Sequence, residues 1–188
     1  MEVQQVIVFV NGPFGVGKST TVRILADDLP EALVIDPEKV GHMLWAQLPQ
    51  RLRTEEFELE PVWPALTRCL IDESSRAYNR TLLVPMTIAR TAVLAQIVGP
   101  LRKQGHDVQH FTLLADAATI RDRLRARGEG PDEWGELSWE GLQVERCIAA
   151  LSEPVFATHL ETGNRNPRAV ADEILRLTGL QQARKART

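Results

Sequence analysis

The stretch Val6-Ile-Val-Phe-Val-Asn-Gly-Pro-Phe-Gly-Val-Gly-Lys-Ser-Thr20 decides the fold of this 188-residue chain. Its first five residues are apolar and predict a buried strand, and a helical pattern begins where the stretch ends. Between the two lies Gly12-x-x-x-x-Gly17-Lys18-Ser19, which is the P-loop pattern in its context of strand, glycine-rich turn and helix. A turn that only links the two elements is the alternative, and the eight-residue match in this position argues against it. The stretch therefore predicts a site for the phosphates of a nucleotide.

The residues of this loop have the chemistry that ATP and Mg²⁺ require. Backbone N–H groups of such a loop converge on an anion, and the following helix N-terminus adds partial positive charge. Lys18 is predicted to reach the β- and γ-phosphates, and the hydroxyl of Ser19 to bind Mg²⁺. We expect the ATP site to consist of Gly12, Pro13, Phe14, Gly15, Val16, Gly17, Lys18, Ser19 and Thr20.

Length and composition predict a single globular domain in the cytoplasm. Hydrophobic residues make up 44% of the chain and charged residues 25%, which is ordinary for a soluble protein. The net charge of −3 and the pI near 5.8 disfavour a nucleic-acid binder, because such proteins carry basic patches. Only two cysteines are present, which fits a reducing compartment. We see no signal peptide before the first strand and no apolar run of the roughly 20 residues that span a bilayer.

Short apolar strands alternate with amphipathic helices along the chain, and this predicts an α/β fold with a parallel sheet. The strands are expected at residues 6–10, 32–35, 81–85, 108–114 and 156–160. Together with the P-loop, this order resembles the three-layer, five-stranded arrangement of P-loop proteins of the nucleotide and shikimate kinase kind. We expect one domain over residues 1–180, with a region covering the acceptor at about 37–78, a lid at about 123–138 and a basic tail at 181–188.

The residues around the P-loop narrow the reaction class, since a P-loop alone serves many functions. The third strand ends in Leu82-Leu-Val-Pro-Met-Thr87, without the carboxylate with which motor ATPases order Mg²⁺ and water. An Asn-Lys-x-Asp signature is also missing, which disfavours a GTPase. The short chain and an arginine-rich helix before a Gly/Pro segment resemble small-molecule kinases, in which such a segment closes over the phosphates.

Asp36 follows the second predicted strand and has two interpretations. It is a good N-cap for a helix that begins at Pro37. In a parallel sheet it also lies at the edge where ligands bind, so it is a candidate to accept the proton of a substrate hydroxyl or to hold a water of Mg²⁺. The two roles are compatible.

Arg123 and Arg127 are four residues apart and therefore share one helix face. Arginine forks suit phosphate oxygens and stabilise a phosphoryl group in transfer, so we expect both residues to take part in catalysis. The alternative is a solvated basic helix end that complements the helix dipole.

Further candidates come from the strand ends and loops. Thr87 and Arg90 follow the third strand and are expected near phosphate or substrate, with helix capping and solvation as the alternative. Trp63, Phe57 and Trp45 are candidates to stack on a base or to line an apolar groove of the acceptor site, with core packing as the alternative for each. Asn164 and Arg165 precede the last helix, where related kinases pack the adenine ring.

Several blocks of the chain, in order, resemble the tunicamycin-resistance protein family. The matching blocks are Asn11-Gly-x-Phe14-Gly-x-Gly-Lys18, Asp36-Pro-Glu-Lys39-x-Gly41, Pro61-x-Trp63, Leu83-Val-Pro-Met-Thr-Ile88, His110-Phe-Thr-Leu113, Arg123-Leu-Arg-x-Arg127-x-Glu-Gly130, Arg146-Cys147 and His159. The resemblance implies an ATP-binding protein that protects a bacterium from tunicamycin, a uracil nucleoside joined to amino sugars and an acyl chain. Because the family resembles P-loop kinases, it also implies phosphorylation of a hydroxyl of tunicamycin or of a related uridine-containing or UDP-like ligand.

The resemblance also implies peripheral attachment to the inner face of the membrane, because family members are described as bound there through a C-terminal amphipathic segment. Two other functions stay open. The first is a protein that sequesters the drug without turnover, and the second is a housekeeping nucleoside or nucleotide kinase.

Overall fold

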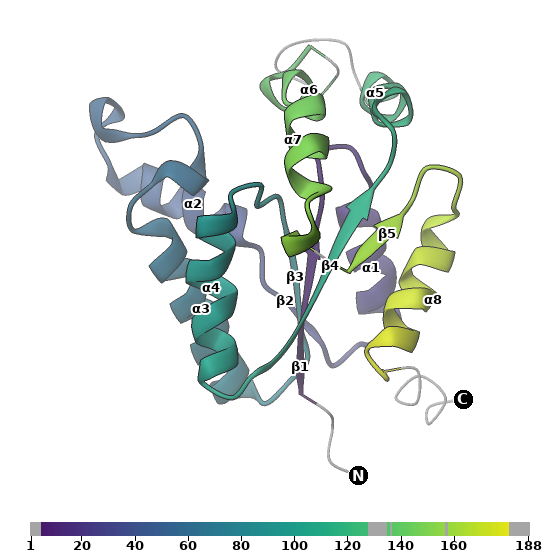
Figure 1. The fold of residues 1–188 in the computed structure, drawn as a ribbon. Coiled ribbons are helices and arrows are strands. Elements are labelled where there is room, and N and C mark those ends of the chain that lie inside the picture. Colours follow the sequence, from purple (N-terminus) through teal and green to yellow (C-terminus); the bar gives the residue numbers. More distant parts are fainter. Residues whose placement is uncertain (1–4, 128–134, 136, 157, 181–188) are drawn as a thin grey trace.

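The computed structural model describes residues 5–127, 135, 137–156 and 158–180. Its five strands form one parallel sheet in the order β2-β3-β1-β4-β5. The strands are β1 (Val6–Asn11), β2 (Leu33–Val34), β3 (Leu82–Met86), β4 (Asp107–Leu114) and β5 (His159–Glu161). The predicted α/β class and five-stranded parallel sheet are confirmed. β1 holds the central position, and its carboxyl end leads directly into the P-loop (Figure 1).

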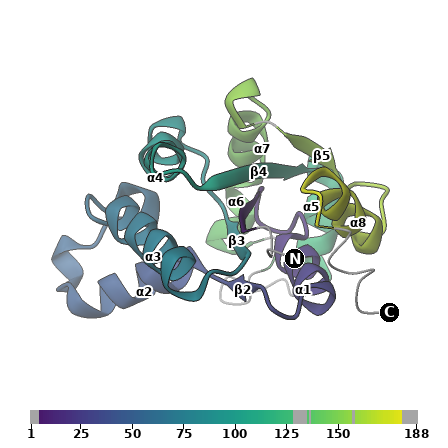
Figure 2. The ribbon, with the colours of Figure 1, turned by 90° about the horizontal axis from the view of Figure 1, so that it is seen from below.

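Helices cover both faces of the sheet, so the fold has three layers (Figure 2). α1 (Lys18–Asp28) and α8 (Pro167–Leu177) pack together on one face, and α3 (Trp63–Tyr78) and α4 (Thr91–Lys103) pack together on the other. The remaining helices are α2 (Pro37–Gln47), α5 (Ala117–Arg125), α6 (Trp139–Leu142) and α7 (Val144–Leu151), with short 3₁₀ turns η1 (Gln50–Leu52), η2 (Phe57–Leu59) and η3 (Pro154–Phe156). None of the described helices is long and apolar enough to span a membrane.

The apolar run of β1 serves both cores because successive side chains point to opposite faces of a sheet. Val6, Val8 and Val10 belong to the core that contains α1 and α8. Ile7 and Phe9 belong to the core that contains α3 and α4. A strand buried on both faces has no polar alternation, and this is why five consecutive apolar residues were a strand signal.

Residues 139–151 form two helices, and the backbone of Gln143 (φ −93°, ψ 0°) ends α6 and begins α7. The last strand, expected over 156–160, is β5 at His159–Glu161, since Pro154–Phe156 forms a 3₁₀ turn. Half of the predicted lid, residues 128–134 and 136, and the whole of the predicted tail 181–188 lie outside the described residues, so the predicted C-terminal membrane attachment stays a prediction.

Asn11, the last residue of β1, ties the P-loop strand to the segment that follows β3. Its Oδ1 accepts hydrogen bonds from the N–H of Gly12 (2.8 Å) and of Ile88 (2.9 Å), and its Nδ2 donates to the carbonyl of Ile88 (2.9 Å). Nδ2 also lies 3.3 Å from Nε2 of His110 on β4. The side chain is almost fully buried, so these groups have little access to water as a substitute partner.

We expect Asn11→Ala to lower the free energy of unfolding by about 2 kcal/mol or more, because it leaves buried N–H and C=O groups without partners. Urea unfolding followed by circular dichroism measures the change. Asn164→Ala is the matched control, since Asn164 is exposed and its replacement is expected to leave stability unchanged. Equal urea midpoints for Asn11→Ala and the unmodified protein would show that the hydrogen bonds of Asn11 add no stability.

Candidate functional site

The P-loop is pressed so closely against β4 and α5 that two of its glycines are obligatory. Gly12 (φ 149°) has the carbonyl oxygen of Leu113 only 2.7 Å from the position that a Cβ would take. Gly15 (φ 79°) would place a Cβ 2.8 Å from Cγ of Leu124. Both positions also have a positive φ that other residues rarely adopt. The loop backbone is therefore held in a curve around a space that suits phosphate oxygens.

Lys18 points into this curve. Its Nζ donates hydrogen bonds to the carbonyls of Gly12 (2.8 Å) and Pro13 (2.9 Å), and it lies 5.4 Å from the ring centre of Phe14. Desolvation lowers the pKa of Lys18 to about 8, although the nearby carboxylate of Glu38 acts in the opposite direction. The loop thus holds an ammonium that gains stability when an anion arrives.

Ser19 and Thr20 follow Lys18 in the first turn of α1, as predicted from the motif. Ser19 is exposed, so its hydroxyl is accessible to a Mg²⁺ ion that accompanies the phosphates. Among the described residues no group of three or more His, Cys, Asp or Glu side chains is arranged to hold a metal ion. The hydroxyl of Ser19, as a single protein ligand, fits a metal that keeps waters and phosphate oxygens as most of its ligands, as Mg²⁺ does.

Arg123 braces the P-loop. Its Nη1 donates to the carbonyl of Val16 (2.9 Å), and its Nη2 donates to the carbonyls of Thr162 (2.8 Å) and Gly163 (3.2 Å). The guanidinium therefore joins the loop to the segment after β5, and both of its terminal nitrogens are engaged by protein oxygens. These contacts give Arg123 a bracing role, and its contact with phosphate stays a prediction.

Arg127 has a different position. Its side chain is exposed, and its positive charge contributes to the lowered pKa of Lys18. The structure thus places it within electrostatic range of the P-loop lysine. Residues 128–134 and 136, the central part of the predicted lid, lie outside the described residues.

Asp36 is the N-cap of α2, as predicted. Its Oδ1 accepts a hydrogen bond from the N–H of Glu38 (3.0 Å), and Pro37 occupies the first helical turn. Glu38, in the first turn of α2, was not among the predicted site residues, and it lines the cavity beside the P-loop. Burial raises the pKa of Glu38, while the ammonium of Lys18 acts to lower it. The signal that the sequence offered was the second acid of Asp36-Pro37-Glu38.

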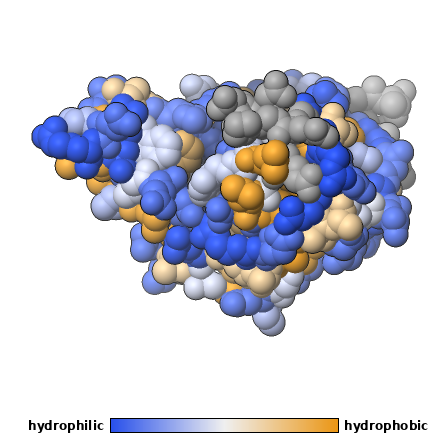
Figure 3. All heavy atoms as spheres, turned by 90° about the horizontal axis from the view of Figure 1, so that it is seen from above, coloured by the Kyte–Doolittle hydropathy of each residue, from blue (hydrophilic) through white to orange (hydrophobic). Residues whose placement is uncertain are grey.

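A cavity of about 250 Å³ opens beside the P-loop, at the carboxyl end of the sheet. Figure 3 looks onto this end of the molecule, where hydrophilic side chains predominate and a small hydrophobic group lies near the centre. The cavity is lined by Phe14, Glu38, His42, Trp45, Glu55, Glu56, Phe57, Glu58, Met86, Thr87, Ala89, Trp139, Glu140, Arg146 and Cys147. It therefore combines one P-loop residue with parts of α2, of the segment before α3, and of α6 and α7.

Aromatic rings form much of the cavity wall. Phe57 lies 4.2 Å from Trp45 and 5.0 Å from His42, measured between ring centres. Gly41 makes this packing possible, because a Cβ there would come within 2.4 Å of the Phe57 ring. Of the three predicted rings, Trp45 and Phe57 line the cavity and Trp63 does not. Trp63 is fully buried, and its Nε1 donates to the carbonyl of Pro37 (3.1 Å). Core packing explains Trp63.

The two candidates after β3 differ in their positions. Thr87 lines the cavity, and its hydroxyl donates to the carbonyl of Gly12 (3.0 Å), so it connects the cavity wall to the P-loop. Arg90 does not line the cavity. Its guanidinium pairs with Glu56 (3.5 Å) and Glu58 (3.8 Å), which gives it a structural role in the described residues.

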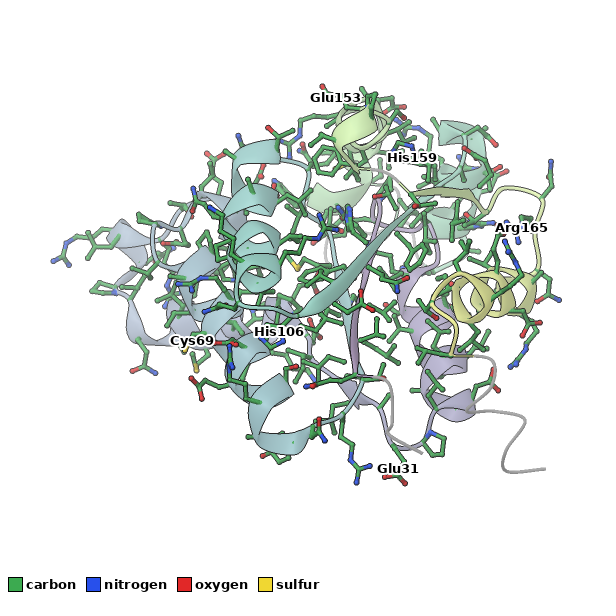
Figure 4. The ribbon with its side chains drawn as sticks, turned by 60° about the horizontal axis from the view of Figure 1, so that its bottom comes forward. Glu31, Cys69, His106, Glu153, His159 and Arg165 are labelled. Carbon is green, nitrogen blue, oxygen red and sulfur yellow. The ribbon has the colours of Figure 1, made fainter. Side chains whose placement is uncertain are left out.

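The segment between β5 and α8, where Figure 4 shows Arg165, carries the predicted adenine contacts. Arg165 forms an ion pair with Glu173 (2.6 Å) and donates to the carbonyl of Ala169 (3.1 Å). Asn164 is exposed. Arg123 ties the start of this segment to the P-loop, so the segment lies beside the nucleotide site, and its contact with adenine stays a prediction.

A central strand, a glycine loop curved around a lysine, and a helix that begins at that lysine define a P-loop nucleotide-binding protein. Residues 7–143 match the sequence profile of the AAA domain family, and the chain belongs to this family. A search of curated protein sequences finds no match.

Solved structures agree with this assignment. The tunicamycin resistance protein of Deinococcus radiodurans is 28% identical, with a TM-score of 0.76 over 93% of this chain and 96% of that chain. A sugar kinase from Janibacter sp. HTCC2649 is 16% identical (TM-score 0.67, 96% and 98% coverage), and the shikimate kinase of Bacteroides thetaiotaomicron is 16% identical (TM-score 0.58, 93% and 98%). The resemblance to the tunicamycin-resistance proteins is confirmed, while the two kinases at lower identity show the fold alone.

We expect the affinity for ATP to be level below about pH 8 and to fall by up to about tenfold per pH unit above it. The sign follows from the lowered pKa: below it Lys18 already carries the charge that the phosphates need, and above it binding must include the uptake of a proton. Isothermal titration calorimetry in buffers of different ionisation enthalpy measures both the affinity and the proton uptake.

Lys18→Ala is the control for this pH dependence. We expect it to bind ATP more weakly and to show no break near pH 8. An unmodified protein with level affinity across this range would contradict the assignment of the charge to Lys18.

Proposed function

We propose that the protein transfers the γ-phosphoryl group of ATP to a hydroxyl of tunicamycin or a related uridine nucleoside. The observation that carries the proposal is the position of Glu38. This carboxylate lines the cavity, and its charge interacts with that of Lys18 in the P-loop. A base on the acceptor side and a cation on the donor side therefore share one site.

The donor half would act through binding and charge. The N–H groups of the loop and the ammonium of Lys18 hold the triphosphate, and the exposed hydroxyl of Ser19 is the group that would hold Mg²⁺. When bound there, the ion would supply positive charge that offsets the charge developing during transfer. Arg127, close enough to influence Lys18, is proposed to stabilise the same charge.

The acceptor half would act through a proton transfer. A hydroxyl oxygen of the acceptor forms the new bond to the γ-phosphorus while the bond to the bridging oxygen breaks and ADP leaves. Glu38 takes the hydroxyl proton, and its burial makes it a better proton acceptor than a solvated carboxylate. Asp36 holds the first turn of α2, which carries Glu38, in place. A direct proton-accepting role for Asp36 is the alternative.

Kinase-fold neighbours and the tunicamycin resistance protein of Deinococcus radiodurans support the proposal by similarity. The partner we propose is a small molecule, and the compartment we propose is the cytoplasm.

The test is to incubate the protein with Mg-ATP and tunicamycin and to weigh the drug by mass spectrometry. A mass gain of one phosphoryl group is expected. Tight stoichiometric binding of the drug without a mass gain would instead favour sequestration.

We expect Glu38→Gln to reduce turnover by about 100-fold or more while the affinity for ATP is kept, because the general base is lost. Asp36→Asn is the matched control: asparagine caps helices as well as aspartate does, so turnover is expected to stay within a few-fold of the unmodified protein. Both variants are measured by initial rates and by ATP titration. The reverse result, with Asp36→Asn inactive and Glu38→Gln active, would move the base to Asp36.

A further inference from the structure

We infer that the cavity accepts an uncharged ligand with a planar ring and hydroxyl groups, a nucleoside rather than a nucleotide, and excludes its phosphorylated forms. The inference rests on the proposed function in one respect, which is that this cavity is the acceptor site. It goes beyond that function because it removes the UDP-like ligands and the nucleotide kinase that the sequence left open.

The first observation is the charge of the cavity lining. Five of its side chains are carboxylates and one is a guanidinium: Glu38, Glu55, Glu56, Glu58, Glu140 and Arg146. Like charges close together in a partly desolvated site cost free energy, and an anionic ligand adds to that cost. The lining therefore opposes a phosphate and suits hydroxyl groups, which donate hydrogen bonds to carboxylates.

The second observation is that the nearby guanidinium groups are already engaged. Nη2 of Arg146 lies 2.7 Å from Oε1 of Glu56. Arg90 pairs with the other oxygen of Glu56 (3.5 Å) and with Glu58 (3.8 Å), whose Oε1 also accepts from the N–H of Ala89 (2.8 Å) and of Arg90 (3.2 Å). A phosphate would compete with Glu56 and Glu58 for these guanidinium groups, and a displaced carboxylate would be left partly buried without its partner.

The third observation is the aromatic wall. Trp45, Phe57 and His42 form one cluster, and Phe14 and Trp139 form a second pair with ring centres 6.0 Å apart. Rings of this kind bury large area with little loss of side-chain entropy and stack on planar groups. Together the walls and the carboxylates match a ligand with one flat apolar part and one hydroxyl-bearing part.

The test uses the full chain with its P-loop occupied by Mg²⁺ and a non-hydrolysable ATP analogue, so that a phosphorylated ligand has only the cavity to bind. Uridine and UMP are titrated against tryptophan fluorescence, because Trp45 and Trp139 line the cavity. Uridine is expected to bind at least about tenfold more tightly than UMP, with a gap that narrows as salt is added. UMP binding as tightly as uridine would overturn the inference, and so would a failure of both to bind.

A charge reversal separates cavity electrostatics from other causes. Glu55 is exposed at the cavity, and Glu55→Lys is expected to tighten UMP binding by about fivefold and so to narrow the preference for uridine over UMP. Glu153→Lys is the matched control, because Glu153, labelled in Figure 4, is exposed just after α7 and does not line the cavity. Equal effects of the two substitutions, or none from Glu55→Lys, would overturn the inference.

This experiment fails independently of the proposed function. It measures binding without transfer, so a cavity that prefers uridine stands even if tunicamycin gains no phosphoryl group. Conversely, phosphorylation of the drug together with equal binding of uridine and UMP would leave the proposed function in place and remove the charge selection.

Discussion

The hydrogen bonds of Asn11 are the interaction on which the rest of the site depends. One buried amide fixes three chain segments: the end of β1, the first residue of the P-loop and the segment after β3. Because Thr87 lies next to that segment, its hydroxyl reaches the carbonyl of Gly12 and the cavity wall is joined to the loop. Buried amides of this kind must satisfy all their groups, so the arrangement has few alternatives.

A second brace acts on the other side of the loop. Arg123 joins the carbonyl of Val16 to those of Thr162 and Gly163, which belong to the segment after β5. Arg123, which the sequence also makes a candidate for phosphate, thus holds the P-loop in position. Its fork of donors suits carbonyls held at fixed spacing as well as it suits phosphate oxygens. The backbone conformation of the P-loop is consequently held by Asn11 of β1 and Arg123 of α5 together.

Charge divides the site into two halves. The P-loop presents Lys18, with Arg127 nearby, to the side where phosphates bind. The cavity presents carboxylates, with Arg146 and Arg90 held by Glu56 and Glu58. Glu38 lies where the halves meet. Its carboxylate acts to raise the pKa of Lys18, and the ammonium of Lys18 acts to lower the pKa of Glu38. Such a division suits the proposed transfer from an anionic donor to an uncharged acceptor.

The sequence by itself determined the α/β class, the parallel sheet, the P-loop and the cap at Asp36, because each depends on local periodicity, glycine placement or capping chemistry. It did not distinguish Glu38 from Asp36, or Trp45 and Phe57 from Trp63. The two carboxylates are close in the chain and similar in chemistry, and so are the three aromatic residues. The direction of each side chain depends on how α2, α3 and the segment between them pack against the sheet. Only the tertiary structure decided which carboxylate and which rings face the cavity, since a cavity wall is formed by residues far apart in the chain.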